Sequence, residues 1–590
     1  MIRIRSLLLA AALAAPAFAA APAAAQEAVQ NVGARTSAVP AILNADQRAQ
    51  YRDIFAAIRA GDWLGASARL DAMPEGPLHP AAREELYLAK GSPRIELDPL
   101  LALLAKAPDL PKADQLARLA INRGAASLPP LPQAHSLVFA GSQPRRGRPQ
   151  PVPRDAASGD VDRQITPLIN DNKPADAEAI FVARINELAP DIQTEFQQRI
   201  AWSYYIIGDD ASAARLAQVA RNGNGDWSTQ AAWTAGLAAW RTRRCDDASD
   251  AFATVAARTT DYELAAAAYY WGARADTSCG HPERVETKLR SAARFKETFY
   301  GLLAASALGI RSPNYGGLHD YRDAEWRPVI DKPDVKAAIA LTEIGETDLA
   351  DQFIRYQAKI GGPGDHYGLI HLACDLDLPS TQLWLAHNAP AGTAVNVAAR
   401  YPRPDWRPAR GWRVDQSLVF AHALQESAFH TDIVSKAGAV GLLQVTPGTA
   451  GDIARKRGEP FTRAELDNPA FNMEFGQERM EALRDMSATG GLLPKVIAAY
   501  DAGPLPVQEW NARDFGKGDP LLYIESIPYW ETRGYVPIVL RNYWMYEQEA
   551  GKADGSREAL VQGLWPRYPG LPGARAVRLT SGNELAMGRD

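Results

Sequence analysis

Apolar residues recur at helical spacing along most of this chain. Over residues 44–125 the stripe begins behind Asn44, a residue type that caps helix N-termini, and it includes Tyr51, Ile54 and Phe55. Val, Ile and Thr rarely alternate at every second position, whereas Ala, Leu, Arg, Glu and Asp are abundant. The pattern therefore predicts an all-α fold with few strands.

A segment rich in Pro, Gly and Arg interrupts the helical pattern over residues 127–160. Its prolines remove backbone donors and restrict φ, so it sustains neither a helix nor a central strand. We expect a linker or an extended strap across the surface. Its arginines are expected to be solvated rather than to form an anion site: Arg145, Arg146, Arg148 and Arg154.

Residues 161–400 have the pattern of stacked helix pairs with a repeat of roughly 34 residues. Trp233-x-x-Gly236 and Tyr270-x-x-Ala273 each precede a polar turn and another amphipathic helix. An aromatic stripe at helical spacing usually belongs to a core. We therefore expect these aromatic residues to be core residues and assign none of them a role in substrate binding: Trp227, Trp233, Trp240, Tyr269, Tyr270 and Trp271.

The three cysteines have no spacing typical of a zinc site. Cys245 and Cys279 are the best candidates for a disulfide, because both fall in helix-turn regions of adjacent repeats, and an exported protein can form one. Three buried free thiols, which include Cys374, are the alternative.

Residues 1–25 have the features of a secretory signal peptide. Arg3 and Arg5 precede an apolar run, and small residues before Gln26 form a cleavage site, after which residues 26–126 make the first helical region. No other stretch reaches the roughly 20 apolar residues of a membrane span. We expect an exported, periplasmic protein. Removal of the two arginines would change the net charge from −5 to −7, which gives no general attraction to nucleic acid.

Residues 401–550 change character, with several short helices that each have their own start and stop signals. Thr446-Pro447 starts one helix and Gly458 ends it, Thr462 with Glu465 forms a capping box, and Asn468-Pro469 starts the next helix. These signals predict a compact α-helical lobe. Residues 551–590 are expected to form an irregular tail.

The first helix of this lobe, over 414–427, carries the candidate for acid catalysis. Val419, Ala423 and Glu426 share one face, so the carboxyl group ends an apolar stripe. Desolvation disfavours a charged carboxylate and raises its pKa, which suits an acid that must keep its proton near neutral pH.

Four blocks of this region resemble the catalytic domain of the soluble lytic transglycosylases, which has a lysozyme-like fold. They are Gln425-Glu426-Ser427, Ser435 to Gln444, Ala499-Tyr500-Asp501-Ala502-Gly503-Pro504 and Glu531-Thr532-Arg533-Gly534-Tyr535-Val536. The preceding region, with Phe299-Tyr300-Gly301-Leu302-Leu303-Ala304, resembles the α-superhelix of that family. The resemblance implies an α-superhelical solenoid of helical hairpins followed by a lysozyme-like helical catalytic domain.

The resemblance also implies a reaction. Peptidoglycan glycan strands would be cut between N-acetylmuramic acid and N-acetylglucosamine without water, leaving a 1,6-anhydro sugar, with Glu426 as acid and then base. Ser435 and Gln444 would contact sugar or acetamido groups, Tyr500 would lie over Glu426, and Glu531 and Tyr535 would close the cleft. No cofactor is implied. A metal site is not indicated either, because the lobe's histidines lack the spacing of ligands.

Several alternatives stay open at this point. Asp501 stands where the family usually has Asn, so it could raise the pKa of Glu426 or act as the second carboxylate of a lysozyme-type hydrolase. A peptidoglycan-binding scaffold without activity is the third possibility. Ser435 could be only a turn residue, the two tyrosines only core residues, and Glu531 a helix N-terminal charge or a partner of Arg533.

Overall fold

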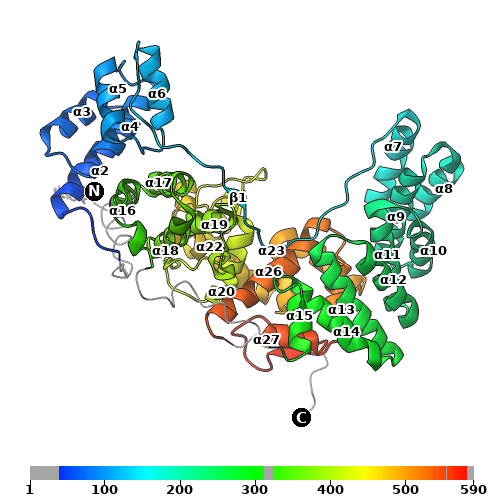
Figure 1. Ribbon diagram of the computed structural model, residues 1–590. Coiled ribbons are helices and arrows are strands. Elements are labelled where there is room, and N and C mark those ends of the chain that lie inside the picture. The colour runs from blue at the N-terminus through cyan, green and yellow to red at the C-terminus, as the bar shows by residue number, and fades with distance from the viewer. Residues whose placement is uncertain (1–38, 311–324, 553–554, 581–590) are drawn as a thin grey trace, which may run out of the picture.

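Helices account for nearly all of the regular structure in this computed structural model, which describes residues 39–310, 325–552 and 555–580 (Figure 1). Within those ranges the strands are only two residues long and form two antiparallel pairs: β1 (Val138–Phe139) with β2 (Asn388–Ala389), and β3 (Trp565–Pro566) with β4 (Ala576–Val577). The predicted all-α class is confirmed. Among the described helices, none has the length and apolar character needed to cross a membrane. The predicted signal peptide lies outside the described residues.

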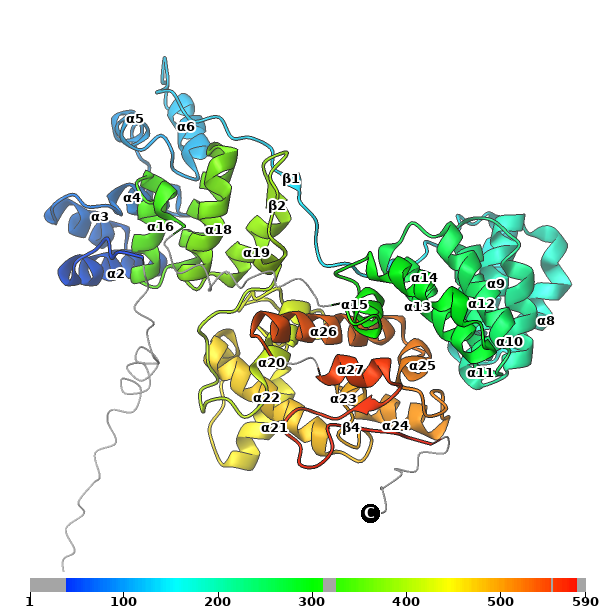
Figure 2. The same cartoon turned by 60° about the horizontal axis from the view of Figure 1, so that its bottom comes forward.

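The first helical block combines two parts of the chain that are distant in sequence. Helices α2–α6 share one buried core with α16–α19, and Figure 2 shows the two sets side by side. The predicted cap Asn44 accepts a hydrogen bond from the Gln47 backbone in a complete capping box. The helices are α2 (Ala45–Ala60), α3 (Trp63–Ala72), α4 (His79–Leu88), α5 (Leu97–Lys106), α6 (Ala113–Asn122), α16 (Pro333–Glu343), α17 (Thr347–Ile360), α18 (His366–Asp375) and α19 (Pro379–His387), with 3-10 turns η3 (Arg327–Val329), η4 (Pro363–Asp365) and η5 (Val397–Arg400).

The solenoid consists of α7–α15, stacked as antiparallel neighbours. Its helices are α7 (Ala156–Asn170), α8 (Pro174–Arg184), η1 (Ile185–Glu187), α9 (Pro190–Ile207), α10 (Asp210–Ala220), α11 (Gly225–Arg241), α12 (Cys245–Arg258), α13 (Tyr262–Cys279), α14 (Pro282–Ala293) and α15 (Phe299–Ala307). A disulfide joins Cys245 to Cys279 with a Cα–Cα distance of 5.6 Å, so the predicted pairing is confirmed. Trp233, Tyr270 and Trp271 are buried, in agreement with their interpretation as core residues. The region 161–400, expected as one superhelix, is divided between two cores: α7–α15 belong to this one and α16–α19 to the first block.

The strap, residues 127–154, runs between the first block and the solenoid (Figure 1). The expectation that its arginines are all solvated is wrong. Arg146 forms ion pairs with Glu525, and Arg154 with Glu195; both carboxylates are buried, with side chains only 1% exposed. Burying a carboxylate is costly unless it is paired, so these arginines anchor the strap.

The lobe contains α20 (Gln416–Glu426), α21 (Pro447–Arg457), η6 (Arg463–Asp467), α22 (Pro469–Asp485), α23 (Leu493–Ala502), α24 (Pro504–Ala512), α25 (Pro520–Glu525), α26 (Trp530–Glu549) and α27 (Gly555–Val561). The predicted caps Thr446 and Asn468 accept hydrogen bonds from the first turns of α21 and α22, and Gly458 ends α21 in the left-handed region. The tail is more regular than predicted, because α27 and the β3–β4 pair pack onto the lobe and α27 also contacts α15.

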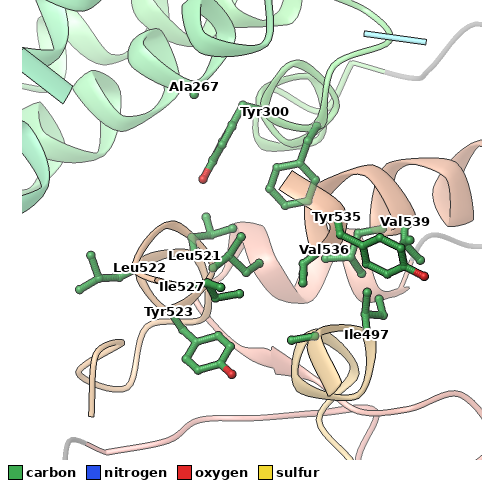
Figure 3. Close-up of a cluster of buried hydrophobic side chains, with 14 of the residues drawn as sticks. Ala267, Tyr300, Ile497, Leu521, Leu522, Tyr523, Ile527, Tyr535, Val536 and Val539 are labelled. Atoms are coloured by element: carbon green, nitrogen blue, oxygen red, sulfur yellow. The ribbon is translucent and has the colours of Figure 1, made fainter. Parts of the chain in front are cut away.

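The core of the lobe continues into the solenoid. Phe299 of α15 stacks on Trp544 of α26 with ring centroids 5.1 Å apart, and the hydroxyl groups of Tyr205 and Ser526 are 2.7 Å apart. Figure 3 shows Tyr300 reaching from the solenoid toward Leu521 and Leu522 of the lobe. The solenoid therefore packs directly against α26 and fixes its position in the lobe.

Candidate active site

Glu426 is the last residue of α20, the central helix of the lobe. The helix is capped at its start by Asp415 and is buried along nearly its whole length, where it packs against α26. Burial raises the pKa of Glu426 to about 7; nearby Asp501 adds to this rise, while the Tyr535 hydroxyl and Arg479 oppose it. The raised pKa expected from the apolar stripe is confirmed, and the carboxyl group is half protonated near neutral pH.

Tyr535 contacts the carboxyl group directly. Its hydroxyl donates to Glu426 Oε1 at 2.5 Å, from the second turn of α26. Sequence reasoning expected this residue at the edge of the cleft, whereas the structure places it on the candidate acid. A donor to the charged form favours ionisation, so Tyr535 limits how far burial raises the pKa of Glu426.

Tyr500 lies near Glu426 without bonding to it. Its hydroxyl donates to the Leu443 carbonyl at 2.8 Å, and the Arg479 guanidinium lies 5.0 Å from its ring centroid. The charge of Glu426 adds to the burial that raises the pKa of this phenol. Tyr500 is therefore fixed in the wall of the site and ties α23 to the loop before α21.

His422 lies one helical turn before Glu426 and supports both tyrosines. Its ring centroid is 4.8 Å from that of Tyr500 and 6.1 Å from that of Tyr535. Nδ1 donates to the Leu418 carbonyl at 2.9 Å, and burial lowers the pKa of the ring to about 4, so His422 is neutral at physiological pH. Among the described residues, no group of His, Cys, Asp or Glu has the arrangement of a metal site.

The glycine-containing loop, residues 435–444, runs beside α20. Ser435 Oγ accepts a hydrogen bond from the Ala439 backbone N–H at 3.0 Å, so its hydroxyl closes the turn. This contact fits the interpretation of Ser435 as a turn residue. Gly441 has a φ of +71°, and a Cβ there would lie 2.4 Å from the Leu466 carbonyl oxygen, which excludes other residues. Gln444 also has a positive φ, of 47°, and its side-chain nitrogen donates to the Gly441 carbonyl at 2.8 Å.

Asp501 and Glu531 lie at the exposed rim. Asp501 Oδ2 accepts from the Thr532 hydroxyl at 2.5 Å, which links α23 to the first turn of α26. Partial burial of the carboxyl group raises the pKa of Asp501; the Thr532 hydroxyl opposes the rise, and the charge of Glu531 adds to it. Glu531 is exposed. The suggested pairing of Glu531 with Arg533 is wrong, since Arg533 donates to the Ile527 carbonyl at 2.9 Å and lies on Trp202.

Besides His422, whose packing role was not expected, three contributors were not identified from the sequence. Arg479 donates to the Tyr500 carbonyl at 2.9 Å, Thr532 holds Asp501, and Asn472 fixes the loop by bonding to Leu443, Val440 and Leu466. Thr532 was inside a block already quoted. Arg479 and Asn472 belong to α22, where nothing in their spacing distinguishes them from ordinary polar helix residues.

Comparison with known proteins finds relatives of the lobe. Residues 407–522 match the family described as Transglycosylase SLT domain. This part of the chain is similar to an SLT domain. Over 157 residues, 26% of its length, the chain is 34% identical to the soluble lytic murein transglycosylase of Salmonella typhimurium. The alignment spans 23% of that relative, so the chain matches about a quarter of its length.

The likeness in fold extends well beyond the SLT domain. The structure of the inactive mutant of lytic transglycosylase Slt from Pseudomonas aeruginosa has a TM-score of 0.52, with 19% identity, over 85% of this chain and 86% of that one. The 70 kDa soluble lytic transglycosylase from Escherichia coli also has a TM-score of 0.52, with 16% identity, over 89% and 99%. The likeness in fold therefore covers most of the chain, and it extends to helices outside residues 407–522.

The candidate site extends past the matched part of the SLT domain. Glu426, Tyr500 and Asp501 lie within residues 407–522, whereas Tyr535 and Thr532 lie beyond them on α26. Tyr535 nevertheless bonds to Glu426, and Thr532 to Asp501. The site is therefore completed by a helix that packs both on the SLT domain and on the solenoid.

Proposed function

We propose that this chain is a lytic murein transglycosylase. It cleaves the β-1,4 bond between N-acetylmuramic acid and N-acetylglucosamine in peptidoglycan and leaves 1,6-anhydro-N-acetylmuramic acid ends. The observation that carries the proposal is Glu426, a carboxyl group with its pKa raised to about 7 and bonded by Tyr535, inside a lobe that matches the SLT family.

The proposed reaction uses one carboxyl group twice. Protonated Glu426 donates its proton to the glycosidic oxygen as the bond from C1 to that oxygen breaks. The resulting carboxylate then accepts the proton of the C6 hydroxyl of the same muramic acid as its oxygen bonds to C1. No water is consumed, and Glu426 ends in its starting state. A pKa near 7 suits both halves, because neither protonation state is then rare at neutral pH.

The surrounding residues support these two steps. In the carboxylate state, Glu426 gains the Tyr535 hydroxyl as a charge-assisted donor, which stabilises the negative charge between the steps. The Gln444 amide nitrogen donates to the Gly441 carbonyl, and its amide oxygen is proposed to accept from an acetamido N–H of the sugar. Ser435, Tyr500 and Glu531 are proposed to line the path of the sugar chain.

Asp501 is proposed to tune Glu426 rather than to react. Its charge adds to the rise of the pKa of Glu426, and its own oxygen is held by Thr532. A hydrolase would instead use Asp501 to activate water opposite the leaving group. We also propose that the protein acts in the periplasm after export, on the glycan strands of the cell wall, without a cofactor.

Product analysis tests the proposal. Purified sacculi are digested with the full chain, and the fragments are weighed by mass spectrometry. Anhydro ends, lighter than reducing ends by one water, are expected. Glu426→Gln should abolish release, whereas Asp432→Asn, which changes an exposed carboxyl group just after α20, should release fragments at the normal rate. Reducing ends would favour the lysozyme-type hydrolase, and no fragments from the unmodified chain would favour the binding scaffold.

A further inference from the structure

A small cavity lies where the strap, the solenoid and α26 meet. We call it the junction cavity; its main lining residues are Arg145 and Arg146 of the strap, Glu263 and Tyr300 of the solenoid, and Trp530 and Arg533 of α26. It faces the side of α26 that packs toward the solenoid, whereas Tyr535 of the same helix faces Glu426. The cavity is thus separate from the candidate active site.

Both glutamates at this junction are already paired. Glu525 accepts two hydrogen bonds from Arg146, at 2.8 and 3.0 Å, and a third from the Tyr300 hydroxyl at 2.7 Å. Glu263 lies 3.4 Å from Arg541 and accepts from the Phe299 backbone. Two carboxylates therefore match two guanidinium groups.

Two further arginines, Arg145 and Arg533, line the junction cavity. Arg533 donates to the Ile527 carbonyl, and its guanidinium lies 4.0 Å from the Trp202 ring and 5.0 Å from the Trp530 ring. Within the described residues, neither Arg533 nor Arg145 forms an ion pair. Burial lowers the pKa of Arg533 to about 9; the charge of Glu525 opposes this fall, and the charges of Arg146 and Arg148 add to it. The junction thus carries excess positive charge, and the N-terminus of the 20-residue helix α26 adds to it.

The size of the junction cavity limits what can occupy it. Its accessible volume is ≈ 40 Å³. One water needs roughly 10–15 Å³ of such space, so the junction cavity has room for about three waters or one small polyatomic ion. A planar guanidinium matches the oxygen pair of a carboxylate or a phosphate, with charge-assisted hydrogen bonds.

We propose that the junction cavity binds one small oxyanion, a phosphate or a carboxylate, between Arg145 and Arg533. The anion neutralises the two unpaired guanidinium groups. It also links the strap to α26, the helix that carries Tyr535 and Thr532, and so braces the solenoid side of the lobe. The site stands independently of the proposed reaction, because neither arginine contacts Glu426.

Isothermal titration calorimetry of the full chain tests this site, first with inorganic phosphate and then with acetate, in a buffer free of other oxyanions. Saturable binding of one anion per chain is expected. Arg145→Gln should weaken it about tenfold, the loss of one charge-assisted contact. Arg163→Gln is the matched control, since Arg163 is an exposed arginine of α7 that does not line the junction cavity, and it should bind normally.

The two titrations distinguish the sources of the anion. Binding of phosphate alone would identify a free phosphate or phosphate ester as the ligand class, and binding of acetate would identify a carboxylate group. Equal affinity in the Arg145→Gln variant, or no saturable binding of either anion, would overturn the proposal. Glu426→Gln should bind the anion as the unmodified chain does, so a failure of this site and a failure of the proposed reaction are distinguishable.

Discussion

The protonation of Glu426 couples the proposed chemistry to stability, and Glu426→Gln measures that coupling. Burial raises the pKa of this carboxyl group from 4.5 to about 7, so the folded state holds its proton more tightly than the unfolded chain does. Ionisation therefore destabilises the fold. The cost is absent below the unfolded value, grows as the pH rises through this interval, and is complete above the folded value.

The magnitude follows from the same two values. At about 1.36 kcal/mol per pKa unit, the rise corresponds to about 3 kcal/mol. A glutamine keeps the shape and still accepts from the Tyr535 hydroxyl, but it never ionises. We therefore expect Glu426→Gln to be more stable than the unmodified chain by about 3 kcal/mol at about pH 8 and to equal it at about pH 4.

Urea unfolding at these two pH values, followed by tryptophan fluorescence, gives both free energies of unfolding. Asp432→Asn is the control. Because this side chain is exposed, the free energy of unfolding of the variant should differ from that of the unmodified chain by the same small amount at both pH values. If Glu426→Gln gained no stability between about pH 4 and about pH 8, the burial argument for the proposed acid would be refuted.

Three further predictions concern the site and the solenoid. Tyr535→Phe removes the hydrogen-bond donor that opposes the rise of the pKa of Glu426. The alkaline limb of the pH–rate profile should therefore move to higher pH by about one unit. Tyr500→Phe is the control and should leave the limb in place, because the Tyr500 hydroxyl donates to the Leu443 carbonyl and not to Glu426. Asp501→Asn removes a charge that adds to the rise, so it should move the same limb to lower pH while turnover on the acid side of that limb is kept. Complete loss of turnover at every pH would mean that Asp501 reacts. Cys245→Ser opens a disulfide that spans 34 residues and should cost about 3–4 kcal/mol in urea unfolding, and an unchanged midpoint would contradict this.

Local interactions explain why much of the fold was predictable. Caps such as Asn44, Thr446 and Asn468 act within three residues, so a sequence pattern contains the whole interaction. The apolar face that precedes Glu426 is equally local, and it was enough to predict a raised pKa. The sequence named Cys245 and Cys279 as the best candidate pair, because they fall in adjacent repeats, but it did not decide between a disulfide and free thiols.

What the tertiary structure decided involves partners far apart in the chain. Tyr535 bonds to Glu426 across 109 residues, and Arg146 to Glu525 across 379. Helices α2–α6 and α16–α19 likewise share one core although they are distant in sequence. Composition and periodicity determined which faces are apolar and which helices form, because both depend on neighbours within a turn or two. Which buried carboxyl group meets which donor depends on how those helices pack in three dimensions, and this pairing determines the chemistry of the candidate site.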